Sequence, residues 1–202
     1  MKPILIDLPM PILTSRLLIR PPQIGDGITL NEAIIESFET LSQFMDWAKE
    51  KPTIEDSEEQ VRLCAANWLL KKSEEPWLQL LIFSRENNRL IGATSFHHIM
   101  WEVPSAETGY WVRVACERRG YMTEALNAIA QYAFKEMKVK RLGITCDVNN
   151  TRSKKLAERL GFVLEGKLKA SRREPLTAKI SDTLVYARYD LTELPDLTVS
   201  WK

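Results

Sequence analysis

Residues 112–126, VRVACERRGYMTEAL, constrain the fold most strongly, because a predicted strand enters a basic turn that opens a long helix over residues 120–137. A helix N-terminus exposes unpaired N–H groups and a partial positive charge. Gly120 allows the backbone to approach a bulky anion, while Arg118 and Arg119 add charge and Thr123 adds a hydroxyl. The turn is therefore suited to a diphosphate, although the same residues also fit an ordinary strand-to-helix connection.

The rest of the chain follows a mixed order of predicted strands and helices. An antiparallel beginning with helical crossovers later predicts an α/β (α+β) fold, with a mixed, mostly antiparallel twisted sheet of about seven strands and helices on both faces. One domain is expected over residues 1–202, with a core at 14–191 and a peripheral tail at 192–202. Strands are predicted at 16–20, 77–84, 90–99, 106–114, 141–147, 162–168 and 183–191, and further helices at 26–47, from Ser57 onward and at 150–160.

Two helix starts can be predicted from capping residues. Asp26 is a candidate N-cap for the first helix. Ser57, followed by Gln60 three residues later, indicates a weak capping box for the second. That second helix carries a predicted buried stripe made of Val61, Cys64, Ala65, Trp68 and Leu69.

Charge is balanced over the whole chain but not along it. The formal net charge is +1, which predicts no general attraction to nucleic acid or to a membrane. Residues 31–75 carry eleven acidic and five basic side chains, whereas residues 113–173 carry fifteen basic and six acidic ones. This asymmetry indicates either two solvated faces or a basic half for a polyanion and an acidic half for a cation.

The cysteines and the apolar segments indicate a cellular compartment. The three cysteines have no metal-ligand or CxxC spacing, which is typical of free thiols in a reducing cytosol. No N-terminal apolar region resembles a signal peptide, and no apolar run reaches about 18 residues, the length of a membrane span. A cytoplasmic location is therefore expected.

Two longer segments resemble a known enzyme family. GYWVRVACERRGYMTEAL (109–126) resembles the coenzyme A-binding motif of the GCN5-related N-acetyltransferase (GNAT) superfamily. NNTRSKKLAERLGFVLEG (149–166) resembles a later segment of its ribosomal-protein N-acetyltransferase (RimJ/RimL-type) group. Weaker matches at 14–22 and 182–191 extend the resemblance over nearly the whole chain. It implies a GNAT fold and transfer of acetyl from acetyl-CoA to a primary amine by direct attack.

The resemblance also implies roles for individual residues. Asn150 would contact the pantetheine or the following loop, and Ser153 would give a proton to the leaving thiolate or, alternatively, cap a helix. Glu117 and Met122 depart from the motif, where a carboxylate should repel phosphate and a large side chain could crowd it. The implied cofactor-binding residues are Val112, Arg113 and Val114 beside the pantetheine, Arg118, Arg119, Gly120, Tyr121, Met122 and Thr123 at the diphosphate, and Asn150 and Ser153.

The general base is less clearly indicated. Glu107 precedes GYW, where the group often has a glutamate, and could act directly, act through water or form a surface ion pair. The group's later glutamate aligns with Arg172 here, which leaves Glu174, two residues on, as a substitute. His97 and His98 are adjacent on a strand and should face opposite sides. No metal site is expected.

The acceptor follows from the pKa of amines. At neutral pH about 10% of an α-amine, but only about 0.04% of a lysine side chain, is neutral and nucleophilic. A weak base therefore favours an α-amine, in agreement with the ribosomal-type resemblance and its protein N-terminal acceptor. A polyamine or antibiotic acetyltransferase, and a non-catalytic acyl-CoA-binding module, are the alternatives. Either a monomer or a homodimer is compatible with the sequence.

Overall fold

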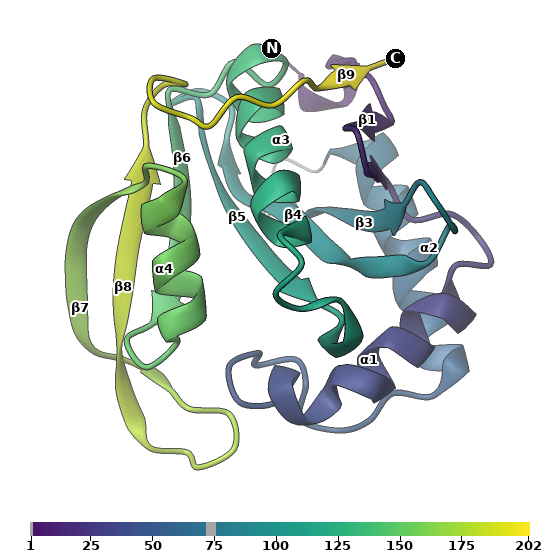
Figure 1. Ribbon diagram of the computed structural model, residues 1–202, viewed down its shortest axis with the longest axis vertical. Coiled ribbons are helices and arrows are strands. Elements are labelled where there is room, and N and C mark those ends of the chain that lie inside the picture. Colours follow the sequence, from purple (N-terminus) through teal and green to yellow (C-terminus); the bar gives the residue numbers. More distant parts are fainter. Residues whose placement is uncertain (1, 72–75) are drawn as a thin grey trace.

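The computed structural model describes residues 2–71 and 76–202, which form one open sheet with helices on both faces (Figure 1). The sheet has nine strands in the order β7-β8-β6-β5-β4-β3-β2-β1-β9. All pairs are antiparallel except β5 with β6, so the predicted mixed, mostly antiparallel sheet is confirmed. The strands are β1 Ile12–Leu13, β2 Leu17–Arg20, β3 Leu78–Ser84, β4 Leu90–Met100, β5 Ser105–Val112, β6 Arg141–Asp147, β7 Val163–Arg173, β8 Ile180–Arg188 and β9 Ser200–Trp201.

Four α-helices lie in the described part of the chain: α1 Gly27–Leu41, α2 Ile54–Leu70, α3 Tyr121–Lys135 and α4 Thr151–Arg159. Figure 1 shows α3 and α4 in front of the sheet and the paler α2 behind it. The core divides in the same way along β3, because successive side chains of a strand point to opposite faces. Leu80 and Ile82 pack with α3, whereas Leu81 and Phe83 pack with α1. No helix among the described residues is long and apolar enough to cross a bilayer.

The start of α2 differs from the prediction. Thr53 accepts a hydrogen bond from the Asp56 N–H at 3.1 Å, and the Asp56 carboxylate accepts one from the Thr53 N–H at 2.8 Å. This is a complete capping box four residues before the predicted one, so the assignment to Ser57 and Gln60 is wrong. Ser57 is buried within the helix instead. Of the predicted stripe, Val61, Cys64 and Trp68 are buried, whereas Ala65 is half-buried and Leu69 is exposed.

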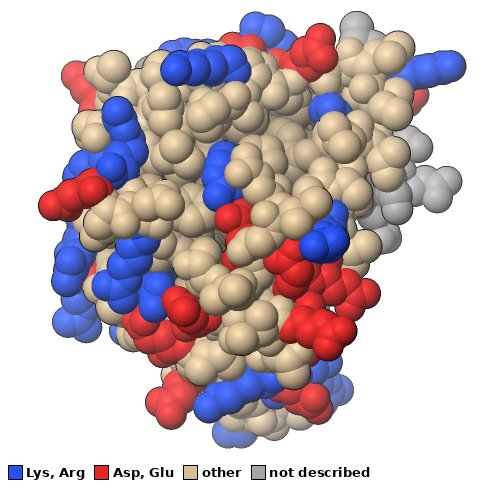
Figure 2. All heavy atoms as spheres, turned by 90° about the vertical axis from the view of Figure 1, so that its right-hand side faces the viewer, with Lys and Arg blue, Asp and Glu red and all other residues tan. Residues whose placement is uncertain are grey.

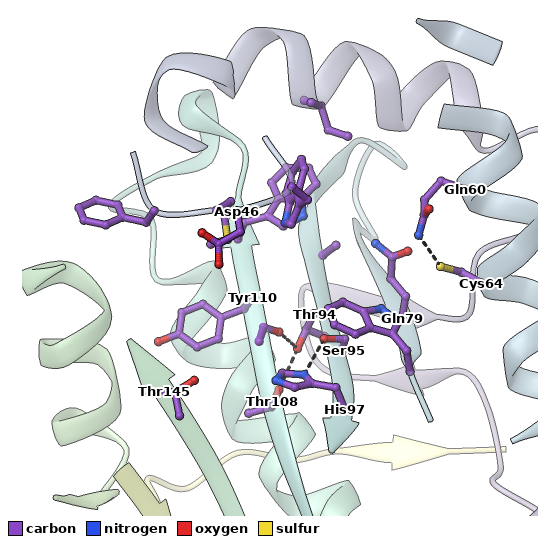
Figure 3. Close-up of a pocket in the computed structure, with 18 of the residues that line it drawn as sticks. Asp46, Gln60, Cys64, Gln79, Thr94, Ser95, His97, Thr108, Tyr110 and Thr145 are labelled. Carbon is purple, nitrogen blue, oxygen red and sulfur yellow. Dashed lines mark hydrogen bonds between the residues drawn. The ribbon is translucent and has the colours of Figure 1, made fainter. Parts of the chain in front are cut away.

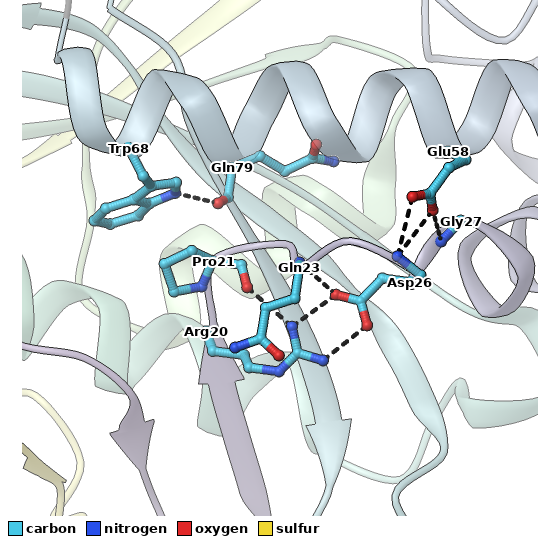
Figure 4. A network of polar contacts seen from close by, with 9 residues as sticks. Arg20, Pro21, Gln23, Asp26, Gly27, Glu58, Trp68 and Gln79 are labelled. Carbon is cyan, nitrogen blue, oxygen red and sulfur yellow. Dashed lines mark hydrogen bonds and ion pairs between the residues drawn. The ribbon is translucent and has the colours of Figure 1, made fainter.

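The start of α1 depends on its neighbours rather than on its own N-cap side chain. Asp26 occupies the N-cap position, but its carboxylate pairs with Arg20 at 2.7 and 2.8 Å. Glu58 of α2 accepts hydrogen bonds from the N–H groups of Gly25 and Gly27 at the start of α1 (Figure 4). α1 ends at Leu41, six residues before the predicted end at 47, and a series of turns follows.

The C-terminal tail joins the sheet. Trp201 in β9 pairs with Ile12 in β1, and on α3 the side chains of Asn127 and Gln131 donate hydrogen bonds to carbonyls of the tail. We expected a peripheral tail from residue 192, whereas the structure adds this segment to the sheet edge. The sequence did not predict this pairing, because β1 lies about 190 residues before β9. Both strands have two residues, which is too short to show an alternation of apolar and polar side chains.

Candidate active site

The sheet opens between β5 and β6. These parallel strands pair only where Ser105–Glu107 meets Arg141–Gly143. Beyond that point β5 continues to Val112 against β4, and β6 continues to Asp147 against β8. The N-terminal ends of α3 and α4 lie along this gap, together with a cavity of about 370 Å³ that Val112, Met122 and Leu156 help to line.

A larger cavity of about 990 Å³ lies toward α1 and α2 (Figure 3). Figure 3 shows Tyr110 and His97 reaching into it from the strands, and Asp46 from the segment after α1. Tyr110, Asn150 and Ser153 line both cavities, so the two spaces adjoin at the opening between β5 and β6. The small cavity thus reaches the N-terminal ends of α3 and α4, and the large cavity extends from it toward α1 and α2.

The glycine turn before α3 has the geometry of an anion cradle. Gly120 has φ +77° and Arg118 has φ +59°, both in the left-handed region. Alternating backbone conformations of this kind direct successive N–H groups into one concavity at the helix N-terminus. Arg16 holds the turn by donating a hydrogen bond to the Arg119 carbonyl at 3.1 Å and by lying over the Tyr121 ring, 4.6 Å from its centroid. Sequence reasoning missed Arg16, because it lies about 100 residues from the turn.

Both departures from the expected motif have a structural explanation. The Glu117 carboxylate pairs with the Arg152 guanidinium of α4 at 2.7 Å, so its charge is compensated beside the turn. Met122 is 8% exposed and packs into the core under α3, although it also borders the small cavity. Neither residue fills the turn itself.

The predicted strand edge at 112–114 is shorter than expected. β5 ends at Val112, and the Arg113 guanidinium pairs with Glu36 of α1 at 2.6 Å. That hydrogen bond is the largest of several that lower the pKa of the Glu36 carboxyl. The Val114 N–H donates to the Ser37 hydroxyl at 3.0 Å. Arg113 and Val114 therefore fasten the end of β5 to α1, and Val112 alone of the three remains beside the opening.

Ser153 lies at the opening with its hydroxyl already partnered. Its Oγ is 2.7 Å from the Tyr110 hydroxyl, and its N–H donates to the Asn150 side chain, which caps α4. Burial raises the pKa of Tyr110 and also that of the nearby Cys146 thiol, so both groups keep their protons at neutral pH. Tyr110 was visible in GYW, but only the fold shows that it meets Ser153 across the opening.

Glu107 lies on β5 and contacts both histidines of β4. Its Oε2 is 3.3 Å from Nδ1 of His98 and 3.8 Å from Nε2 of His97. The prediction that the two imidazoles face opposite sides is wrong, because a bulge shifts the register between His97 and Met100. His97 lines the large cavity and stacks on Trp77, whereas Glu107 is not among the lining residues. As a base, Glu107 would reach the cavity through His97.

The alternative base, Glu174, lies in the turn between β7 and β8. Its carboxylate accepts hydrogen bonds from Thr177 at 2.5 Å and from Asn149 at 3.2 Å, and it lines neither cavity. Arg172 does line the large cavity, with Nε 3.4 Å from the buried Asp147 carboxylate. The position aligned with the expected base is therefore occupied by an arginine of β7, whose guanidinium pairs with a carboxylate of β6 across the intervening strand β8.

Acidic side chains predominate in the wall of the large cavity. The carboxylates of Asp46, Glu50, Asp56 and Asp147 line it, whereas the basic side chains among its lining residues are Arg172 and His97. Figure 2 shows a cluster of acidic side chains on the side of the molecule that carries α1 and α2. The acidic half predicted from residues 31–75 therefore borders a chamber, which favours a cationic occupant.

Comparisons with known proteins place the chain among acetyltransferases. Residues 16–163 match the family described as Acetyltransferase (GNAT) domain. The chain is 30% identical to the ribosomal-protein-serine acetyltransferase of Escherichia coli (strain K12) over 159 residues, which cover 79% of this chain and 84% of that protein.

Solved structures show the same relationship. RimL, a ribosomal L7/L12 α-N-protein acetyltransferase solved in complex with coenzyme A, superposes with a TM-score of 0.78 and 25% identity, covering 89% of this chain and 97% of that one. An acetyltransferase from Salmonella typhimurium that modifies the N-terminal serine of ribosomal protein L7/L12 gives a TM-score of 0.75 at 25% identity, covering 89% and 99% of the two chains.

Proposed function

The chain belongs to the acetyltransferase (GNAT) domain family and is an acyltransferase that uses acetyl-CoA; from this premise we propose that it acetylates the α-amine at the N-terminus of a protein. The observation that carries this proposal is the acidic chamber, which joins the opening of the sheet at Tyr110 and Ser153. An amine acceptor in the large cavity and a thioester donor in the small one would meet at this junction.

The residues at the opening fit acetyl-CoA, which supplies the activated acetyl group when bound. The N–H groups around Gly120 would hold the diphosphate, with Arg118 and Arg119 adding charge and Tyr121, Met122 and Thr123 forming the first helical turn. The β5 edge at Val112 and the Asn150 amide would contact the pantetheine. Pairing of Glu117 with Arg152 removes the repulsion that the sequence suggested.

The acceptor side supports a cationic amine. The carboxylates of Asp46, Glu50 and Asp56 would attract an amine that arrives protonated, and Trp47, Trp77 and Trp111 offer apolar surface for a neighbouring side chain. Neither proposed base, Glu107 or Glu174, lines the chamber, and an α-amine loses its proton far more readily than lysine does. An N-terminal α-amine therefore suits this chamber better than a lysine side chain.

Ser153 is our proposed proton donor. As the new C–N bond forms and the C–S bond breaks, the amine nitrogen loses one proton and the sulfur gains one. The Ser153 hydroxyl would donate a proton to the sulfur, while the Tyr110 hydroxyl, 2.7 Å away, would pass its own proton to Ser153. The proton lost by the amine would go to water, and water would return one proton to Tyr110. The raised pKa of Tyr110 keeps the pair protonated at neutral pH, as a donor requires.

Replacing Ser153 with alanine should lower kcat about 100-fold, since a positioned proton donor typically contributes at least that factor. The Kd for acetyl-CoA should stay within about twofold, because the Asn150 side chain still caps α4 through the residue-153 N–H. Steady-state kinetics and calorimetry measure the two quantities. Ser171→Ala, which removes a hydroxyl from β7 outside both cavities, is the matched control. An unchanged kcat in Ser153→Ala would remove the serine from the mechanism.

The acceptor class is tested with a panel at fixed acetyl-CoA. Three amines are compared by kcat/KM: a peptide with the N-terminal serine that the relatives' names specify, spermidine and an aminoglycoside. We expect the peptide to exceed both small amines at least about tenfold. A preference for spermidine or the aminoglycoside would replace the protein N-terminus with a small-amine acceptor. Acetyl-CoA binding without transfer to any amine would favour a non-catalytic acyl-CoA-binding module.

A further inference from the structure

Both histidines of the chain meet one carboxylate at the end of the large cavity. The sequence contains two histidines, His97 and His98, and both lie against Glu107. One ligand atom from each residue lies within 4.8 Å of the other two. Two imidazoles and a carboxylate are a recurrent ligand set for zinc, so the cluster has the composition of a metal site.

An unusual backbone conformation brings the second imidazole to this cluster. In a regular strand His98 would point to the opposite face from His97. Instead, His98 has φ +47° within the bulge before Met100. Residues other than glycine adopt this conformation only rarely, and those that do cluster at functional sites. The bulge also explains why two adjacent histidines did not reveal a metal site in the sequence.

The spacing of the ligand atoms is close to that of a tetrahedral ion. Ligands about 2.0–2.1 Å from zinc in tetrahedral geometry lie about 3.4 Å from one another. Oε2 of Glu107 is 3.3 Å from Nδ1 of His98 and 3.8 Å from Nε2 of His97. Two of the three separations are therefore within about half an ångström of the tetrahedral value, and one ligand atom from each of the three residues lies within 4.8 Å of the others.

The surroundings orient the ligands and leave the site accessible. Nδ1 of His97 lies 3.3 Å from the Ser95 hydroxyl, an outer contact that leaves Nε2 for the ion. Trp77 stacks on the face of the His97 ring, whereas a metal would bind in the plane of that ring. The neighbouring Arg141 pairs with Glu165 at 2.5 Å, so its charge is compensated. His98 is 72% exposed, which gives an ion access from solvent.

We propose that His97, His98 and Glu107 bind a divalent transition metal ion, Zn²⁺, with water completing the coordination. This assignment does not depend on which amine the enzyme acetylates. It gives Glu107 and His97 a role as ligands in place of the sequence-based role of Glu107 as a base.

The test uses the full-length chain without a histidine tag. Calorimetric titration with ZnCl₂ should give one site, weakened at least about tenfold in His98→Asn and in Glu107→Gln. Asparagine tolerates the left-handed conformation, so His98→Asn keeps the bulge while removing the imidazole. Glu102→Gln, which removes a nearby exposed carboxylate, is the control and should bind as the wild type does.

A second measurement tests the proposed zinc ligands in the wild-type chain, without any substitution. With two histidines in the chain, an imidazole ¹H–¹⁵N spectrum contains two rings, and stoichiometric Zn²⁺ should shift both. An absence of zinc binding, or imidazole signals that do not move, would overturn the proposal. So would zinc binding that survives in the His98 and Glu107 variants but disappears when Cys64 and Cys146, the cysteines lining the large cavity, are replaced by serine.

Discussion

Replacing Gly120 with tryptophan should raise the Kd for acetyl-CoA at least about 100-fold. Gly120 has φ +77°, a conformation that costs an L-residue about 1–2 kcal/mol. The new side chain would also lie directly before the N-terminus of α3. Its Cβ alone would be 3.5 Å from the Arg16 guanidinium. An indole there would cover the N–H groups proposed to hold the diphosphate. Calorimetric titration with acetyl-CoA measures the loss.

Gly25→Trp separates this effect from backbone strain. Gly25 has φ +96°, and no heavy atom beyond its chain neighbours lies within 4 Å of an added Cβ. The variant therefore incurs a similar conformational cost before α1, away from the turn at Gly120. We expect its Kd for acetyl-CoA to stay within about threefold of the wild-type value, since it leaves the anion site intact. If both variants lose affinity equally, the cradle at Gly120 is not the binding site.

Replacing Gly92 with alanine should destabilise the protein by about 3 kcal/mol, at the upper end of the range for overpacking. Gly92 lies in β4 between Ile82 and Val112, at the centre of the sheet. An added Cβ would overlap the Trp111 carbonyl oxygen and lie 3.0 Å from the Val112 Cα. These are backbone atoms, which cannot move aside as a flexible side chain can. Denaturant unfolding monitored by tryptophan fluorescence measures the loss.

Gly166→Ala provides the matched control in the same sheet. Gly166 lies in β7, and an added Cβ there would meet no heavy atom within 4 Å. The substitution should be neutral within about 0.5 kcal/mol, as most surface changes are. Because β5 borders the proposed cofactor site, Gly92→Ala should also weaken acetyl-CoA binding, whereas Gly166→Ala should not. Equal unfolding free energies for the two variants would contradict the close approach of β4 and β5.

Local patterns predicted the elements that carry the chemistry. The turn at Gly120, helix α3 and helix α4 follow from residues adjacent in sequence, so hydrophobic spacing and local turn residues were sufficient. The capping role of Asn150 was seen only in the structure. The extra strands β1 and β9 have two residues each and were missed, because periodicity has no meaning over that length. The capping box at Thr53 was placed too late, since Ser57 offers a similar residue type one turn further on.

Features that depend on distant partners could not be predicted. Arg16 at the glycine turn, Glu117 with Arg152, and Tyr110 with Ser153 each join elements separated by tens of residues. The opening between β5 and β6 forms because the two strands stop pairing after Glu107 and Gly143. Hydrophobic alternation within each strand does not show where two strands stop pairing. Regular strand geometry predicted that His97 and His98 face opposite sides of the sheet, but the bulge at His98 brings both imidazoles to the same carboxylate.

The central claim, that the chamber receives an α-amine, is tested most directly by mapping the acetyl group on one peptide. The peptide carries a free N-terminal serine and one internal lysine, and the product is located by fragmentation mass spectrometry. The α-amine should carry at least about 90% of the acetyl label at neutral pH, since a far larger fraction of it is neutral. Acetylation mainly on the lysine, or a rate no higher than without enzyme, would contradict the proposed function.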